Sequence, residues 1–260
     1  MNICKIFSRF KKQKAAPKVR FFCLEPGVAD VYPITKSASI KRKWLDDTSQ
    51  QNVSSVNCPG INKIVSTGWV MLAPADFMIT TNGDGVTFNW LEPYRFTKVT
   101  DGMDAYVASH PKEQTEIFLD DDQTLKTVIK IETPWRVEAD DDVVFLQMPV
   151  AYNNEDRFTA ATGILDLRYA HLMNVQLFWK KLEGNHLVRA GTPLCQYIPM
   201  SRKALSVSSY DVTMEYANEL DRQKELEFNY ASNCVILKED SLASRLTRTL
   251  AVLNKYKKRG

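Results

Sequence analysis

The chain has 260 residues, of which 44% are hydrophobic and 25% are charged, so it can bury a substantial core and has a globular composition. A formal net charge of only +3 gives the whole chain no electrostatic preference for nucleic acid. Five scattered cysteines without a CxxC pair argue against a disulfide framework or a structural zinc site and indicate a reducing, cytoplasmic compartment. The sequence contains no apolar run of the ~20 residues that a transmembrane segment needs.

Residues 1–19 form a basic N-terminal tail. They contain no acidic residue, and apolar positions recur in them at helical spacing. Two interpretations fit: a short amphipathic anchor for a membrane or polyanion, and a loose tail whose apolar residues pack on the domain. In either case, attraction to nucleic acid or an anionic surface is expected to be weak and sensitive to salt.

Short strands separated by turns are predicted for residues 20–90. The expected strands are 20–24, 31–34, 66–72, 77–81 and 86–90, with a hairpin opening at Cys58-Pro59-Gly60. Asn82-Gly83-Asp84-Gly85 predicts a tight turn, because Asn and Gly accept positive φ angles. A calcium loop at this turn is the weaker alternative, since the EF-hand pattern is absent.

The cluster Lys41-Arg42-Lys43-Trp44 places basic residues beside an aromatic ring. Such a cluster can stack on a nucleobase or hold a phosphate. A solvated strand end is the simpler interpretation.

Residues 126–202 form the centre of the predicted β domain. Alternating apolar residues and proline- or glycine-marked corners predict strands at 125–131, 143–149, 163–169, 174–181 and 194–199. The third and fourth of these are expected to pair, and 183–185 is expected to be a turn. The triplets Asp120–Asp122 and Asp140–Asp142 could bind a divalent cation, but adjacent carboxylates on an extended chain alternate in direction, which favours solvated turns.

Residues 204–260 change to a helical period and predict a helical C-terminal extension. Its second helix carries an apolar stripe with two arginines on the other side: Leu242, Leu246, Leu250 and Leu253, with Arg245 and Arg248. Because a lone helix of this length is marginal in water, the stripe is expected to be buried. It either docks on the β domain or supports self-association, and the second option makes it a candidate interaction surface.

The sequence shows no catalytic motif. Its three histidines form no ligand pattern, and no phosphate loop or nucleophile elbow is present. We therefore predict no catalytic residue, no metal and no cofactor. The remaining candidates are aromatic and polar residues at strand ends, which could hold a small ligand: Trp135, Asp166, Gln196 and Arg202. For the five tryptophans, packing in a sandwich core is the competing interpretation.

The core stretch resembles a family of uncharacterised proteins of tailed phages, of the T4-like cyanophage type. The resemblance is carried by Pro134-Trp135, Pro149, the Gly163–Asp166 strand and the module Gly191-Thr192-Pro193 with Gln196, Pro199 and Arg202. It covers residues 20–203. Where many relatives have a Gly-Tyr-Ser turn after the Pro-Trp strand, this chain has Asp140–Asp142. The resemblance implies a jelly-roll-like β-sandwich and a phage origin, and it implies no known activity.

Together these patterns predict a mainly β, jelly-roll-like sandwich over residues 20–203 with a helical C-terminal extension. The expected function is that of a non-enzymatic interaction or virion-associated protein with a phage or host protein as partner, acting in the host cytoplasm or the virion. The alternative is an enzyme or sensor that binds a small ligand in the mouth of the barrel.

Overall fold

The computed structural model describes residues 17–24, 27–46, 58–92, 106–110, 122–203 and 220–227. The chain divides into two units. The first comprises Met1–Lys36 and Gly68–Ala204, and the second comprises Ser37–Thr67 and Leu205–Gly260. Every strand described here belongs to the first unit.

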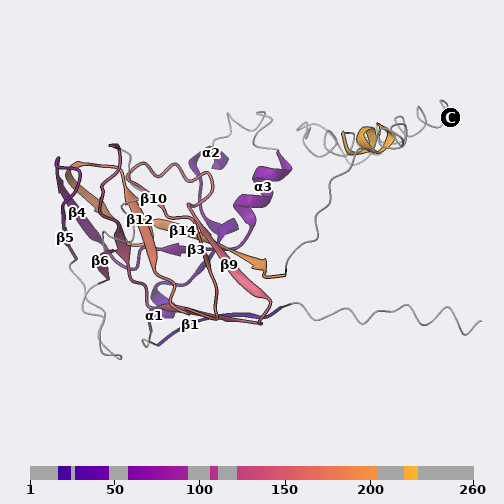
Figure 1. The fold of residues 1–260 in the computed structure, drawn as a ribbon, viewed down its shortest axis with the longest axis horizontal. Coiled ribbons are helices and arrows are strands. Elements are labelled where there is room, and N and C mark those ends of the chain that lie inside the picture. The colour runs from indigo at the N-terminus through magenta and orange to yellow at the C-terminus, as the bar shows by residue number, and fades with distance from the viewer. Residues whose placement is uncertain are drawn as a thin grey trace, which may run out of the picture. The chain divides into compact units, whose positions relative to one another are not determined.

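The described strands of the first unit form four antiparallel sheets (Figure 1). The largest has the order β11 (Gly163–Leu165), β9 (Val143–Met148), β14 (Pro193–Ser201), β3 (Trp69–Leu72) and β2 (Thr35–Lys36). A four-stranded sheet has the order β10 (Phe158–Ala160), β12 (Val175–Trp179), β7 (Ile129–Ile131) and β6 (Val107–Ser109). A three-stranded sheet has the order β13 (Glu183–Val188), β4 (Phe77–Asn82) and β5 (Phe88–Leu91). Finally, β1 (Val19–Cys23) pairs with β8 (Trp135–Ala139).

One apolar core joins these sheets, and several of their strands contribute alternate side chains to it. In β4, Phe77, Ile79 and Thr81 are buried, whereas the residues between them are partly exposed. In β12, Val175, Leu177 and Trp179 follow the same alternation, and the core cluster contains residues of all four sheets. The prediction of a mainly β, sandwich-type fold is therefore confirmed.

Short helices make up the described part of the second unit. They are the 3-10 helix η3 (Ser37–Ser39), α2 (Lys43–Asp46) and α3 (Pro59–Ser66), and residues 220–227 are also helical. Within the described ranges, no helix has the length and apolar character required to span a membrane. The rest of the predicted C-terminal extension, including its leucine stripe, lies outside the described residues.

The basic cluster at Lys41–Trp44 is not a solvated strand end. It leads into α2, and Arg42 is buried. The Arg42 guanidinium donates from Nη1 to the carbonyls of Ser37 and Ile40, and its burial lowers its pKa. The described contacts therefore give Arg42 a structural role and leave its side chain unavailable for a phosphate.

Two corrections concern the first part of the chain. The predicted hairpin at Cys58-Pro59-Gly60 is instead the start of α3, because proline is well tolerated in the first helical turn, where backbone N–H groups have no intrahelical partner. The predicted extended piece at 31–34 is not a strand, because Val31 ends the single-turn helix α1 (Val28–Val31) and the two-residue strand β2 begins only at Thr35.

Two further corrections concern residues 163–188. Strand β11 ends at Leu165, because the carbonyl of Asp166 accepts the N–H of Tyr169 in a turn. It pairs with β9, whereas β12 pairs with β10 and β7, so the predicted pairing of 163–169 with 174–181 is wrong. The predicted turn at 183–185 is the first half of β13.

The predicted turn at Asn82–Gly85 is present, with positive φ at both glycines. The Asp84 carboxylate accepts the N–H groups of Val86 and Thr87 and the Thr87 hydroxyl. These hydrogen bonds lower the pKa of Asp84 far below its usual value. The bond from the Thr87 hydroxyl has the largest effect, and the two N–H groups add to it. The Asp84 carboxylate therefore stabilises the turn, as the simpler interpretation of the sequence predicts.

Candidate functional site

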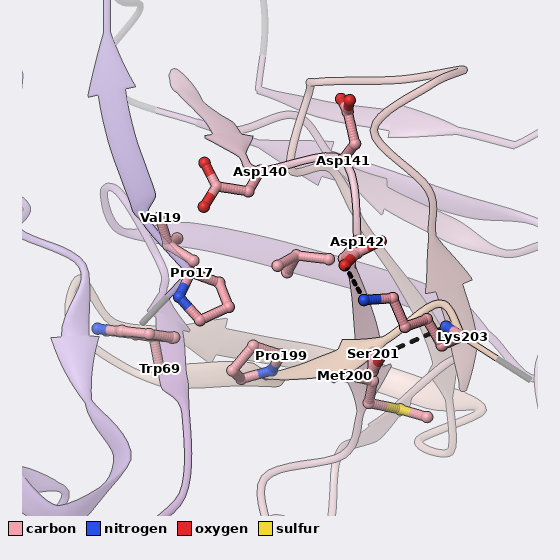
Figure 2. A pocket seen from close by; sticks show the side chains of 11 residues that line it. Pro17, Val19, Trp69, Asp140, Asp141, Asp142, Pro199, Met200, Ser201 and Lys203 are labelled. Atoms are coloured by element: carbon pink, nitrogen blue, oxygen red, sulfur yellow. Dashed lines mark hydrogen bonds and ion pairs between the residues drawn. The ribbon is translucent and has the colours of Figure 1, made fainter. Parts of the chain in front are cut away.

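A cavity of about 860 Å³ opens at one end of the five-stranded sheet (Figure 2). The start of β9, the start of β3 and the end of β14 meet here, since Val143 pairs with Ser201 and Trp69 pairs with Tyr197. The cavity is lined by apolar residues on one side and by the turn between β8 and β9 on another. We call it the acidic pocket, because that turn is Asp140-Asp141-Asp142.

The apolar wall of the acidic pocket is built around Trp69. Figure 2 shows the rings of Pro17, Trp69 and Pro199 grouped together, with Met200 beyond them. The Trp69 ring packs against the ring of Phe21 in an edge-on arrangement, with 5.1 Å between the two ring centroids. Met200 keeps 41% of its surface exposed, so the wall presents apolar side chains to solvent.

The position of Trp69 depends on the glycine before it. Gly68 has φ +78°, and a Cβ atom built there would lie 2.1 Å from the carbonyl oxygen of Tyr197. Only glycine therefore lets β3 run this close to β14. This close approach places the Trp69 ring at the edge of the cavity.

The acidic turn is held by a carboxylate contact of Asp140 and a backbone contact of Asp142, and all three aspartates are exposed. Asp140 accepts the Lys18 N–H at Oδ2 over 2.9 Å, and the Asp142 carbonyl accepts the Arg202 N–H over 2.7 Å. The Asp142 carboxylate forms an ion pair with Lys203, drawn as a dashed line in Figure 2. Asp141 is exposed, and its carboxylate has no hydrogen-bond or ion-pair partner among the described residues.

The lining of the acidic pocket carries excess negative charge. Three aspartates and one lysine, Lys203, give a formal charge of −3 + 1 = −2 at neutral pH. No group of three or more His, Cys, Asp or Glu side chains in the described ranges has the geometry to hold a metal ion. An apolar wall beside unneutralised carboxylates suits a ligand that is both cationic and partly apolar.

Of the four predicted ligand-binding residues, the structure brings together Asp166 and Arg202. Arg202 Nη2 donates to Asp166 Oδ1 over 2.6 Å, and Arg168 also holds the carboxylate through Nε and Nη2. The pKa of Asp166 is lowered from 3.8 to about 2. The hydrogen bond from the Arg168 side chain has the largest effect, and the Arg168 backbone N–H adds to it. Both groups are thus engaged in a structural ion pair adjacent to the acidic pocket.

Trp135 and Gln196 do not line the acidic pocket. Trp135 is 7% exposed, belongs to the core, and donates from Nε1 to the Tyr32 carbonyl over 3.0 Å. Gln196 is fully buried and accepts the Ala151 N–H at Oε1 over 3.1 Å. Both side chains are buried in the fold, and for Trp135 this agrees with the core-packing interpretation.

The fully buried Cys195 thiol is not an activated nucleophile. Burial raises the pKa of the Cys195 thiol far above its usual value, and burial likewise raises the pKa of Tyr197. His171 Nδ1 lies 3.1 Å from the Val137 carbonyl, and His186 Nε2 lies 2.9 Å from the Glu183 carbonyl. These groups make structural contacts.

Sequence reasoning misses the acidic pocket. The pattern of the aspartate triplet favours a solvated turn, which describes its backbone correctly. Nothing in the local sequence indicates that Trp69, about seventy residues earlier, lies beside it, because this proximity arises from the pairing of β3 and β9 with β14.

No protein-family model and no curated protein matches the chain. Two similar solved structures are native EIAV dUTPase and a point mutant of the dUTPase from phage phi11 of S. aureus. The first is 11% identical, with a TM-score of 0.33, over 75% of this chain and 98% of that chain. The second is 8% identical, with a TM-score of 0.32, over 75% of this chain and 97% of that chain. Similarity at this level gives no information about activity.

Proposed function

We propose that this chain is a non-enzymatic interaction protein of phage type, whose β domain binds a basic segment of a partner protein in the acidic pocket. The carrying observation is the combination, in one cavity, of a net formal charge of −2 and an apolar wall formed by the partly buried Trp69 and Pro199 and the exposed Met200. The phage origin rests on the resemblance of residues 20–203 to proteins of tailed phages.

A basic polypeptide fits this cavity better than a simple cation. Lysine and arginine combine an apolar stem with a charged head, so the stem can lie on Trp69 while the head approaches Asp140 or Asp141. Proline residues in the segment would add flat apolar surface against Pro17 and Pro199 and would lower the entropy lost on binding. A metal ion would use only the carboxylates and leave the apolar wall uncovered.

The contacts of the reactive side chains support a binding role. Cys195 is buried with a raised pKa, and the rings of His171 and His186 each meet a backbone carbonyl. Asp166 forms ion pairs with both Arg168 and Arg202. The charged group left most available at the site is the Asp141 carboxylate, which suits electrostatic recognition of a partner.

Fluorescence anisotropy tests the proposal with a short labelled peptide of lysine, arginine and proline. We expect saturable binding that weakens as salt rises, and little binding of a matched peptide with glutamate in place of the basic residues. Asp141→Asn is expected to weaken binding about two- to fivefold. Trp69→Ala is expected to weaken it about tenfold or more.

Matched controls are available in the same unit. Asp156→Asn removes an exposed aspartate that pairs with Lys181, and Trp90→Ala removes a tryptophan that is 41% exposed on β5. Neither residue lines the acidic pocket, so both variants should bind like the wild type. Equal binding of the acidic peptide, or unchanged binding by both Asp141→Asn and Trp69→Ala, would refute the proposal. Mass spectrometry of purified virions and of infected-cell extracts would then separate a virion role from a role in the host cytoplasm.

A further inference from the structure

A second cavity, of about 520 Å³, lies where the connection between β10 and β11 passes β9 and β12. We call it the amide pocket, because two glutamine side chains, Gln147 and Gln176, line it. It also contains Thr159, Thr162, His110 and Phe178, and it shares no lining residue with the acidic pocket. Its volume is in the range of small-molecule sites.

A chain of hydrogen bonds fixes the orientation of both amides. The Ala161 carbonyl can only accept, so the group of Gln147 that faces it over 3.0 Å is the NH₂ group. Gln147 Oε1 then accepts the Tyr197 hydroxyl over 2.6 Å. The second bond of the Gln147 NH₂ group, over 3.3 Å, goes to Gln176 Oε1. Gln176 therefore keeps its own NH₂ group as a donor at the pocket.

The other polar groups of the amide pocket both donate and accept. The hydroxyls of Thr159 and Thr162 have this property, and the imidazole of His110 can do either according to its tautomer. His110 Nδ1 is buried and has no hydrogen-bond partner among the described residues. A buried polar atom without a partner is costly, and a bound group that donates to it or accepts from it removes that cost.

The lining contains no Asp, Glu, Lys or Arg side chain among the described residues. A charged ligand would therefore lose its hydration without gaining an opposite charge, which disfavours ionic ligands. Phe178 pairs with Thr159 across β10 and β12, so an aromatic ring lies beside a hydroxyl. A ligand with hydroxyls around an apolar C–H face can satisfy both.

We infer that the amide pocket binds an uncharged saccharide. Its C–H face would lie on Phe178, and its hydroxyls would accept from the Gln176 NH₂ group and exchange hydrogen bonds with Thr159, Thr162 and His110. The inference stands apart from the proposed peptide-binding role, because the two cavities have different linings, one negatively charged and the other uncharged.

NMR titration of the intact chain tests this inference. The probes are neutral sugars, namely glucose, galactose, mannose, N-acetylglucosamine, maltose and lactose, with glucuronate and glucosamine as charged comparisons. We expect at least one neutral sugar to shift the side-chain NH₂ signals of Gln176 and the ring signals of His110 and Phe178 in a saturable way. The charged sugars should bind more weakly than the neutral ones.

Two substitutions refine the test. Gln176→Glu keeps the shape of the side chain but replaces the donor with a carboxylate, and it should lower sugar affinity about tenfold. Asn89→Asp, an exposed amide on β5 outside the pocket, makes the same chemical change and should leave affinity unchanged.

The wild-type titration does not depend on how well either variant folds. Absence of saturable shifts with every neutral sugar, shifts that map to other residues, or equal binding of the charged sugars would overturn the inference.

Discussion

Arg202, just after β14, pairs through Nη2 with Oδ1 of Asp166, just after β11, over 2.6 Å, while its backbone N–H donates to the Asp142 carbonyl over 2.7 Å. One residue thus ties the end of the central strand to two separate turns. Arg202 therefore has a structural role beside the acidic pocket.

Replacing Asp166 with asparagine should change the acid dependence of stability. The pKa of Asp166 in the folded chain is lowered from 3.8 to about 2, so its stabilising effect is complete above about pH 4 and is lost as the pH falls toward 2. Urea unfolding across this range should show a steeper loss of stability in the wild type than in Asp166→Asn. Identical slopes for the two proteins would mean that the ion pair contributes nothing in solution.

Gly68→Ala should destabilise the β domain by about 3 kcal/mol or more, because the residue has a positive φ and its Cβ would meet the Tyr197 carbonyl oxygen. Gly163→Ala is the matched control, since a Cβ there meets nothing within 4 Å and its φ is not in the positive region. Thermal unfolding compares the two. If both variants melt at the same temperature, the close approach of β3 to β14 is wrong.

Trp135→Ala should cost about 3–5 kcal/mol, because the side chain is buried in the core and donates to the Tyr32 carbonyl. Trp90→Ala, on the edge strand β5, should cost much less. The free energy of unfolding in urea measures both. A Trp135→Ala protein as stable as the wild type would show that the ring does not belong to the core.

Cys195 should resist alkylation in the native protein, because it is fully buried and its pKa is raised. Cys23 and Cys58 are partly exposed and should react faster. Iodoacetamide labelling with peptide mapping, with and without urea, gives each rate. Native labelling of Cys195 as rapid as that of Cys58 would reveal an opening of the sheet that the structure does not show.

The leucine stripe Leu242, Leu246, Leu250 and Leu253 stays a prediction from the sequence alone. If it supports self-association, light scattering should give an oligomer for the intact chain and a monomer for the double variant Leu246→Glu, Leu250→Glu. A monomer in both cases, with the variant less stable, would favour packing within one chain.

Strands with clear alternation are predictable from the sequence. Residues 77–81 and 143–149 correspond closely to β4 and β9. Strand β4 buries alternate side chains, and β9 is a mainly apolar run that is buried along most of its length. Local turn signals are less dependable. Pro59-Gly60 has the composition of a turn, yet apolar residues at Ile61, Ile64 and Val65 have helical spacing and favour α3.

Pairing between distant strands is not predictable in this way. β1 pairs with β8 over more than a hundred residues, and no local pattern distinguishes this partner from others. The candidate site also depends on pairing between distant strands. Asp166 and Arg202 are candidates because of their positions at strand ends and do meet, whereas the neighbourhood of Trp69 and Asp141 follows only from the full sheet order.

The place of β14 in the five-stranded sheet has a consequence for synthesis on the ribosome. This strand comes after all its partners in the chain, yet it lies between β9 and β3. Until residues 193–201 have emerged, β3 and β9 each lack a neighbour along one edge, and such open edges favour aggregation. High contact order slows folding, so the nascent domain should depend on chaperones until this last strand inserts.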